Sequence, residues 1–378
     1  MSKAEYKRLG DYIREVNVRN RDLKVTKPMG INIDKRFMPS VANVIGTDLS
    51  TYKLVSRMQF ACNLMHVGRD EKIPMAMLTE NKPIIVSPAY FVLEVIEPNV
   101  LLPEYLMMWF RRKEFDRNAW FYTDADVRGG MSKDALLDMR LPIPSITRQR
   151  EIVSEYETLT NRIRLNNQMI QHLEATAQAL YRKTFVGNID KENLPEGWRI
   201  GMLTDIATYL NGTACQKYET DGMDFLPVLK IRELSQGCCD EDSDHVEVTI
   251  PHDYVINTGD VVFSWSATLF IDIWCGGKCA LNQHLFKVSS SVFPKWFYFL
   301  WTHKHIAEWK RLISAKATSM GHIKREDLES AQVIIPSDDT LKDMDAQMNP
   351  LFEMYILKKQ ENLKLTEFQS LLLAEMGQ

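Results

Sequence analysis

The chain has 378 residues, a length at which two or three domains are usual. Hydrophobic residues make up 45% of it and charged residues 25%, which excludes a chain that stays disordered. The formal net charge of −4 excludes a uniformly basic, nucleic-acid-binding surface, so any phosphate-binding surface has to be local. Residues 3–36 are such a segment, with ten Lys or Arg against five Asp or Glu.

The opening residues and the cysteines point to the cytoplasm. The first sixteen residues lack the basic and then apolar pattern of a signal peptide, and no apolar run approaches the ~18 residues that span a bilayer, so we expect no membrane contact. Six cysteines in a chain of this length predict reduced thiols. Cys238, Cys239, Cys275 and Cys279 could supply four sulfurs to zinc, but they lack the usual C-x2-C spacing, so we expect no metal.

The first half begins with about 145 residues of mixed character. Short apolar or alternating runs, such as residues 83–95, indicate strands between turn-rich loops. A long helix follows, because residues 148–184 contain neither Pro nor Gly.

This helix carries an unbroken heptad seam with alternating spacings of four and three residues. The seam consists of Ile152, Tyr156, Leu159, Ile163, Asn166, Ile170, Leu173, Ala177 and Leu180. One polar core position, Asn166, is typical of a coiled coil whose register is fixed by a buried amide. The alternative is an amphipathic helix packed on a globular core, which would show a wider stripe.

The second half repeats this order. Residues 260–273 indicate strands, and the aromatic run 296–301 could suggest base stacking, although a continuous apolar run in a helical segment is typical of a core. A second long helix is expected from residue 341 to 375. We predict that it pairs antiparallel with the first helix, forming a rod of roughly 50 Å that spaces two domains.

Three pairs of segments show that the chain is duplicated. Residues 134–145 and 326–337 both have an acidic start and an apolar run closing on Pro-Ser, and Pro336 follows Pro144 by 192 residues. Residues 102–110 match 293–301, and residues 9–13 match 203–207, at nearly the same offset. The repeat predicts two equivalent domains.

Several stretches inside this frame resemble one family. Asn193-Leu-Pro-Glu-Gly-Trp198, Asn211-Gly212, residues 258–262, residues 280–283, residues 318–321 and the Ile-Pro-Ser closings are similar to target recognition domains of Type I restriction-modification specificity subunits. The first half lacks the LPEGW opening and the Leu-Asn-Gln stretch. The resemblance covers essentially the whole chain.

The resemblance implies an α+β fold in which two repeated mixed α/β DNA target recognition domains are separated by two long antiparallel coiled-coil helices. The domains would be residues 1–147 and 190–337, the helical spacers 148–189 and 338–378. Such a subunit recognises a bipartite, asymmetric target in double-stranded DNA. It docks methyltransferase subunits, here two, and in some complexes restriction and translocase subunits.

The sequence contains no recognised catalytic motif. It has neither an Asn/Asp-Pro-Pro-aromatic methyltransferase motif nor a phosphate loop. Residues 336–342 are faintly similar to a nuclease carboxylate-lysine set, but helix capping explains them. We therefore expect no catalytic residue and no cofactor.

Phosphate anchors and base-reading side chains are expected in the loops. The candidates are Arg19, Arg21, Lys24, Lys27, Arg69 and Arg128 in the first half, and Lys217, Lys230, Arg232, Ser264, Ser266, Lys316, Thr318, Ser319 and His322 in the second. Two alternatives stay open: a nucleotide-modifying enzyme with degenerate motifs, and a protein–protein scaffold without DNA contact.

Overall fold

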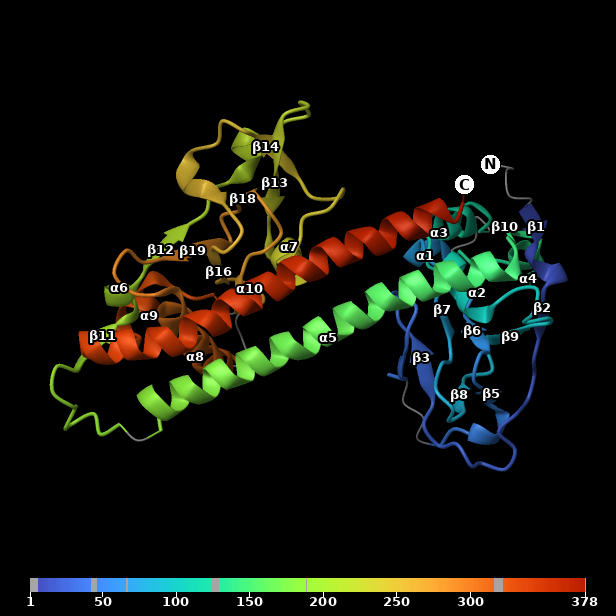
Figure 1. The fold of residues 1–378 in the computed structure, drawn as a ribbon, viewed down its shortest axis with the longest axis horizontal. Coiled ribbons are helices and arrows are strands. Elements are labelled where there is room, and N and C mark those ends of the chain that lie inside the picture. The colour runs from blue at the N-terminus through green and yellow to red at the C-terminus, as the bar shows by residue number, and fades with distance from the viewer. Residues whose placement is uncertain are drawn as a thin grey trace. The chain divides into compact units, whose positions relative to one another are not determined.

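The computed structural model describes residues 6–41, 46–65, 67–123, 129–187, 189–315 and 322–377, without the side chains of 68, 69 and 312–315. The chain forms two compact units, one of Met1–Arg162 with Thr366–Gln378 and the other of Ile163–Leu365. Both long helices contribute one segment to each unit (Figure 1). We call the units unit 1 and unit 2 and describe each by itself.

Unit 1 is built on short antiparallel strands. A four-stranded sheet has the order β2-β9-β6-β7, with β2 at Ile13–Glu15, β9 at Phe91–Val95, β6 at Phe60–Cys62 and β7 at Met75–Met77. The ends of the first half pair as β1 (Tyr6–Arg8) with β10 (Arg140–Pro142). Two further pairs are β3 (Met29–Ile31) with β4 (Phe37–Pro39), and β5 (Lys53–Val55) with β8 (Ile84–Val86).

Helices cover the core of unit 1. They are α1 (Val67–Asp70), α2 (Pro103–Phe110), α3 (Lys113–Phe121) and α4 (Lys133–Asp138). Pro103 occupies the first turn of α2, where its missing N–H costs nothing, and the Ser132 hydroxyl caps α4 by accepting from the Ala135 N–H at 3.1 Å. Both helices therefore start where local sequence dictates.

Unit 2 contains two four-stranded sheets and one strand pair. The first sheet is β12-β19-β16-β17, at Thr208–Asn211, Leu285–Ser289, Val261–Ser264 and Phe270–Ile273. The second is β14-β13-β18-β15, at His245–Glu247, Phe225–Leu229, Cys279–Leu281 and Val255–Ile256. The pair is β11 (Arg199–Met202) with β20 (Gln332–Ile335).

The helices of unit 2 include the aromatic segment noted in the sequence. They are α6 (Leu203–Ile206), α7 (Ile231–Gln236), α8 (Lys295–Ala315) and α9 (Arg325–Ser330). In α8, Trp296, Phe297 and Trp301 are buried against Phe185, in a core that also contains Phe263. The expectation that this run belongs to a core is confirmed.

The duplication reappears as strand pairing. In unit 1, β1 pairs with β10, and β2 pairs with β9, which pairs with β6. In unit 2, β11 pairs with β20, and β12 pairs with β19, which pairs with β16. The Leu9 N–H donates to the Met139 carbonyl at 2.8 Å, and the Leu203 N–H donates to the Ala331 carbonyl at 2.9 Å. The repeated residues 9–13 and 203–207 thus occupy equivalent places.

The two long helices are α5 (Ile146–Phe185) and α10 (Asp338–Glu375). In unit 2 the two helices contact each other at Thr184 with Met344 and at Asn166 with Asn362. The residue numbers fall along α5 as they rise along α10. Their pairing is therefore antiparallel, as predicted. All nine seam positions of α5 are buried or half-buried.

Residues 337–342 begin a helix. The Ser337 hydroxyl accepts from the Thr340 N–H at 3.4 Å, and Asp338 and Asp339 lie in the first turn of α10, where carboxylates favour the helix dipole. The capping interpretation is confirmed. Pro350 lies inside this helix.

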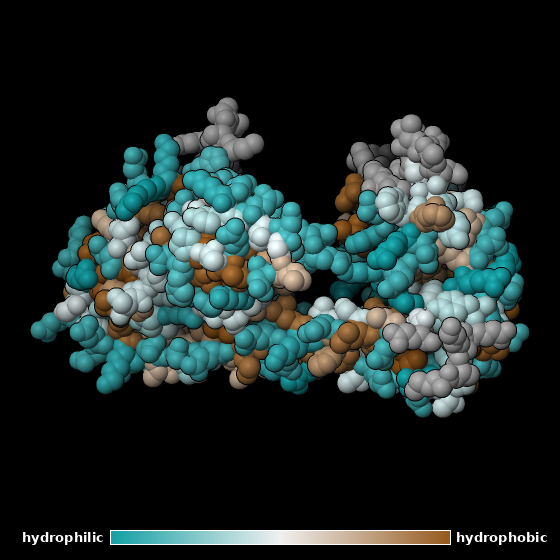
Figure 2. Space-filling model, turned by 90° about the horizontal axis from the view of Figure 1, so that it is seen from above, coloured by the Kyte–Doolittle hydropathy of each residue, from teal (hydrophilic) through white to brown (hydrophobic). Residues whose placement is uncertain are grey.

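The surfaces of both units are mainly hydrophilic on the face shown in Figure 2, with smaller hydrophobic patches. No helix in the described ranges is long and apolar enough to cross a membrane. Within the same ranges, no group of three or more His, Cys, Asp or Glu side chains is arranged to hold a metal ion.

Candidate nucleic-acid interface

A basic loop, residues 19–27, lies between β2 and β3 of unit 1. Asn20 is fully buried and organises the loop: its side-chain amide donates to the Val25 carbonyl at 2.8 Å and accepts from the Val25 N–H at 3.4 Å. Leu23 has a φ of 53°, in the left-handed region, which turns the chain back. This internal bonding presents the loop as a defined surface.

The four cations of the basic loop are not equivalent. Arg21, Lys24 and Lys27 are exposed, and Lys24 pairs with Asp22 at 2.8 Å, a surface ion pair that a phosphate can replace at small cost. Arg19 is half-buried and donates to the carbonyl of Thr51. Three of the four candidates therefore face solvent, whereas Arg19 holds the loop to its neighbour.

Lys230 and Arg232 of unit 2 are engaged by acids. Lys230 forms an ion pair with Asp244 at the start of α7. Arg232 donates to both oxygens of Asp240, at 2.8 and 3.0 Å, and contacts Glu233 at 2.6 Å. Hydrogen bonds from Arg232 hold the pKa of Asp240 well below its usual range. These cations build a local network, so phosphates would have to compete with carboxylates for them.

Ser264 and Ser266 do not face solvent. Ser264 is 0% exposed and Ser266 3% exposed, and the Ser264 hydroxyl donates to the Ser266 carbonyl at 3.3 Å. A serine at the end of a strand-like run can point to either face, and the four-stranded sheet buries this end. We do not retain these two hydroxyls as DNA contacts.

Trp265, between the two serines, gathers residues from three other segments. Its indole N–H donates to the Asn211 side chain at 3.1 Å, and its ring lies 6.0 Å from the His284 ring and 5.9 Å from the His322 ring. We call Asn211, Trp265, His284 and His322 the Trp265 cluster. His284 and His322 are exposed and Trp265 is half-buried, so the cluster presents polar ring atoms to solvent.

The backbone beneath the Trp265 cluster is closely packed. A Cβ at Gly212 would lie 2.2 Å from the Asn282 carbonyl oxygen, so only glycine fits this turn. Asn282 is 4% exposed and its side chain accepts from the His284 N–H at 3.2 Å. Ala267, two residues after Trp265, has a φ of 55°. These contacts place the cluster on a fixed support rather than on a free loop.

Of the remaining candidates, the structure describes only one side chain. Lys217 is exposed in the turn Cys215–Tyr218, which follows the Asn211-Gly212 turn. Arg69 belongs to α1, but its side chain lies outside the description. Arg128, Lys316, Thr318 and Ser319 lie outside the described residues.

Sequence analysis missed most of the Trp265 cluster. His322 and the serines flanking Trp265 were candidates, Asn211 and residues 280–283 were only motif positions, and His284 was not considered. These segments meet because β16 pairs with β19 while the Ile323 N–H donates to the Trp265 carbonyl at 3.0 Å. The signal available in the sequence was the pair of tight motifs at 211–212 and 280–283.

Four of the six cysteines are buried thiols that are poorly suited to catalysis. Cys62, Cys215, Cys275 and Cys279 are buried, and burial raises the pKa of Cys62 to about 12 and that of Cys275 to about 11. A thiol with such a raised pKa stays protonated and is a poor nucleophile or metal ligand.

Known proteins match this chain in sequence and in fold. Residues 195–370 match the family described as the Type I restriction modification DNA specificity domain. The MjaIX specificity subunit of Methanocaldococcus jannaschii, a Type I restriction enzyme subunit, is 23% identical over 308 residues, covering 75% of this chain and 70% of that protein. The HindI specificity subunit of Haemophilus influenzae is 35% identical over 98 residues, 24% of this chain and 21% of that protein.

A solved structure shares the fold. The Type I restriction-modification S subunit from M. genitalium superposes with a TM-score of 0.58 at 9% identity, covering 100% of this chain and 97% of that one. Three comparisons point to the same kind of protein: the matching domain, the relative that aligns along most of the chain, and the shared fold. Residues 195–370 therefore belong to the Type I restriction modification DNA specificity domain family, and the chain as a whole shares the fold of a Type I restriction-modification S subunit.

Proposed function

We propose that this chain recognises a bipartite, asymmetric target in double-stranded DNA, with residues 1–147 reading one half and residues 190–337 reading the other. The observation that carries this proposal is the repeated strand pairing, β1–β10 with β2-β9-β6 in one half and β11–β20 with β12-β19-β16 in the other. Two similar but non-identical readers in one chain suit a target with two different halves. As a specificity subunit, the chain serves recognition, and the chemistry belongs to other chains.

The base-reading surface of the second half is the Trp265 cluster. Imidazole and amide groups can donate to and accept from base edges in the major groove. His284 and His322 are exposed and fixed beside Trp265, so little conformational freedom is lost on binding. We expect His284→Ala and His322→Ala to weaken binding of the specific target by about 10-fold or more while leaving non-specific binding nearly unchanged.

The phosphate-anchoring surface of the first half is the basic loop, through Arg21, Lys24 and Lys27. Cations that release counterions from phosphates give binding that weakens with salt. Because the chain is acidic overall, we expect weak DNA binding by the chain alone and tighter binding once partner subunits complete the complex. Equal affinity with and without these partners would contradict this expectation.

The two helical segments, 148–189 and 338–378, serve as spacer and docking surface. We propose that two methyltransferase subunits bind there, joined in a restriction complex by restriction and translocase subunits. A helix of the length of α5, Ile146–Phe185, extends about 60 Å at ~1.5 Å per residue, more than the ~34 Å of one DNA turn. Its length suits a ruler for the gap between the two target halves.

The decisive experiment maps methylation. The chain is co-expressed with the methyltransferase encoded beside it, and methylated adenines in the host DNA are located by long-read sequencing. We expect a split motif with a fixed gap, of which one half changes when residues 1–147 are exchanged for those of a relative. A stable complex that methylates no defined motif would instead favour a scaffold without DNA contact.

A further inference from the structure

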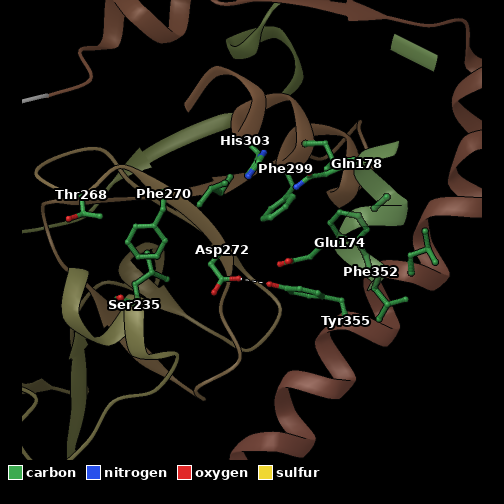
Figure 3. Close-up of a pocket in the computed structure, with 16 residues that line it drawn as sticks. Glu174, Gln178, Ser235, Thr268, Phe270, Asp272, Phe299, His303, Phe352 and Tyr355 are labelled. Carbon is green, nitrogen blue, oxygen red and sulfur yellow. Dashed lines mark hydrogen bonds between the residues drawn. The ribbon is translucent and has the colours of Figure 1, made fainter. Parts of the chain in front are cut away.

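A pocket of about 410 Å³ opens within unit 2 (Figure 3). None of the residues of the Trp265 cluster lines it. Its walls come from α5, α7, β17, α8 and α10. No described candidate for DNA binding lines it. The volume lies in the ~300–1,000 Å³ range of pockets that hold small molecules.

Aromatic rings from three elements surround the pocket. Phe270 comes from β17, Phe299 from α8, and Phe352 and Tyr355 from α10. The Phe299 and Phe352 rings pack edge to face with centroids 5.5 Å apart, which fixes that corner. Ring faces attract a cation as well as apolar groups.

One wall carries two carboxylates, Asp272 of β17 and Glu174 of α5, which both point toward the Tyr355 hydroxyl (Figure 3). Asp272 is well supplied with donors. The Tyr355 hydroxyl donates to its Oδ1 at 2.9 Å, and the Lys359 ammonium donates to its Oδ2 at 2.6 Å. The single Tyr355 proton is thereby committed to Asp272.

Glu174 is left in a different position. It lies beside the same Tyr355 hydroxyl, whose one proton cannot serve two carboxylates at once. Although Glu174 is an exposed residue, desolvation where it faces the pocket raises the pKa of its carboxyl. A bound ammonium group would replace solvent as the donor to Glu174 and would add a positive charge beside it.

The other titratable group facing the pocket does not oppose a cation. His303 of α8 lines it and stacks on Phe299 with ring centroids 6.4 Å apart. Burial, together with Lys310 and Arg182, lowers the pKa of His303, so its imidazole is neutral at neutral pH. Lys359 is the cation bound to this wall, and it is paired with Asp272. Two carboxylates against one ammonium group leave the wall with a net negative charge.

We propose that this pocket binds a small organic cation, a protonated primary amine with an apolar body. The ammonium group lies between Glu174 and Asp272, and the body lies against Phe270, Phe299 and Phe352. Because the lining joins α5 and α10 to β17, α7 and α8, a bound amine holds the helix pair of unit 2 to its sheet and raises the stability of that unit.

The test uses the full chain, with 2-phenylethylamine as the probe and 2-phenylethanol as its neutral counterpart. We expect the amine to bind with a Kd of about 0.1–1 mM by calorimetry and to raise the melting temperature, whereas the alcohol binds at least ~10-fold more weakly. Equal binding of the two compounds, or no binding of the amine at millimolar concentration, would overturn the proposal.

Variants assign the binding to this wall. Glu174→Gln should weaken amine binding by about 10-fold, while Glu174→Asp, which keeps the charge, should retain most of it. Glu157→Gln, an exposed acid on the same helix, should change nothing. Unchanged amine binding in Glu174→Gln would refute the site, and the melting temperature without ligand reports whether that variant folds.

Two further measurements distinguish amine binding from DNA binding and from docking of the methyltransferase. DNA binding by Glu174→Gln should equal that of the unchanged chain, because the pocket is not part of the proposed interface. If the amine does not bind but Glu174→Gln weakens association with the methyltransferase, the pocket receives a cationic side chain of that partner, and the small-molecule proposal is wrong.

Discussion

Gln149 is the residue that ties the start of α5 to the rest of unit 1. It is 0% exposed, and its amide donates to the carbonyls of Val100 and Pro144 while accepting from the Leu102 N–H, all at 2.8 Å. Three backbone groups of the segments flanking α2 and preceding α5 thus depend on one side chain. This role could not be predicted from local sequence, since a glutamine in a charged helix usually faces solvent.

Gln149→Leu is therefore expected to destabilise the chain by about 2–4 kcal/mol, because each buried polar group that loses its partner costs ~1–3 kcal/mol. Urea unfolding measures the free energy of unfolding. Gln171→Leu, an exposed glutamine on the same helix, is the matched control and should stay within ~0.5 kcal/mol. Similar losses in both variants would show that the bonds of Gln149 carry no special weight.

His303 makes stability depend on pH. Its folded pKa lies below the unfolded value because burial and nearby cations disfavour the imidazolium. The unfolded state therefore binds more protons, so this contribution is complete above the unfolded pKa of ~6.5 and is lost as the pH falls below it.

We accordingly expect the unchanged chain to lose more stability between pH 7.5 and pH 5.5 than His303→Gln, which cannot take up the proton. Urea unfolding at both pH values in parallel gives the comparison. Identical pH dependence in the two proteins would mean that His303 has the same pKa folded and unfolded.

At the scale of elements, Asn166 sets the register of α5 against α10 in unit 2. It is 3% exposed, and its amide donates to the Asn362 side chain at 3.0 Å, while Asn362 donates to Asn167 at 2.8 Å. Buried amides of this kind hold one alignment of two helices at some cost in stability.

Asn166→Leu should lower the free energy of unfolding by about 1–2 kcal/mol, because the Asn362 carbonyl loses its buried donor. The double variant with Asn362→Leu should recover that loss or exceed the original stability. A double-mutant cycle with a coupling energy of ~0.5 kcal/mol or more would support the pairing, and strictly additive effects would contradict it.

The aromatic run of α8 was predicted to be buried, but the element it packs against was not. This run predicts burial, and the Trp296 indole N–H donates to Asp345 of α10 at 2.7 Å, so the same run also fixes the start of the second long helix. Burial was predictable, whereas the partner was not, because 49 residues separate the two side chains.

At the scale of the whole molecule, DNA affinity should depend on a few exposed cations. The triple variant Arg21→Ala, Lys24→Ala, Lys27→Ala is expected to weaken DNA binding and to lower the slope of log K against log salt by up to ~3, since each phosphate contact contributes ~0.9. Fluorescence anisotropy of the assembled complex at several salt concentrations measures both quantities.

A matched variant controls for charge. Lys82→Ala, Lys191→Ala and Lys278→Ala remove three exposed lysines outside the basic loop and outside the proposed docking helices, and should leave the slope nearly unchanged. Equal loss in both triple variants would mean that net charge, and not the basic loop, governs binding.

The sequence alone determined the duplicated frame, the two long helices and the seam of α5. These features are periodic or repeated along the chain, and each is dictated by local spacing: apolar residues every three or four positions, and equivalent motifs about 192 residues apart. For the same reason the strands around residues 83–95 and 260–273 could be predicted as strands but not paired with their neighbours.

The tertiary structure decided which candidate residues face solvent and which meet. Arg19, Lys230 and Arg232 bond to backbone or acidic groups, Ser264 and Ser266 are buried, and the Trp265 cluster forms. The ion pairs of Lys230 and Arg232 join residues 14 or fewer positions apart, whereas the Trp265 cluster depends on strand register and on a contact over 54 positions, Trp265 with Asn211. Local sequence carries no record of such distances, because pairing over long separations is set by the free energy of the whole fold.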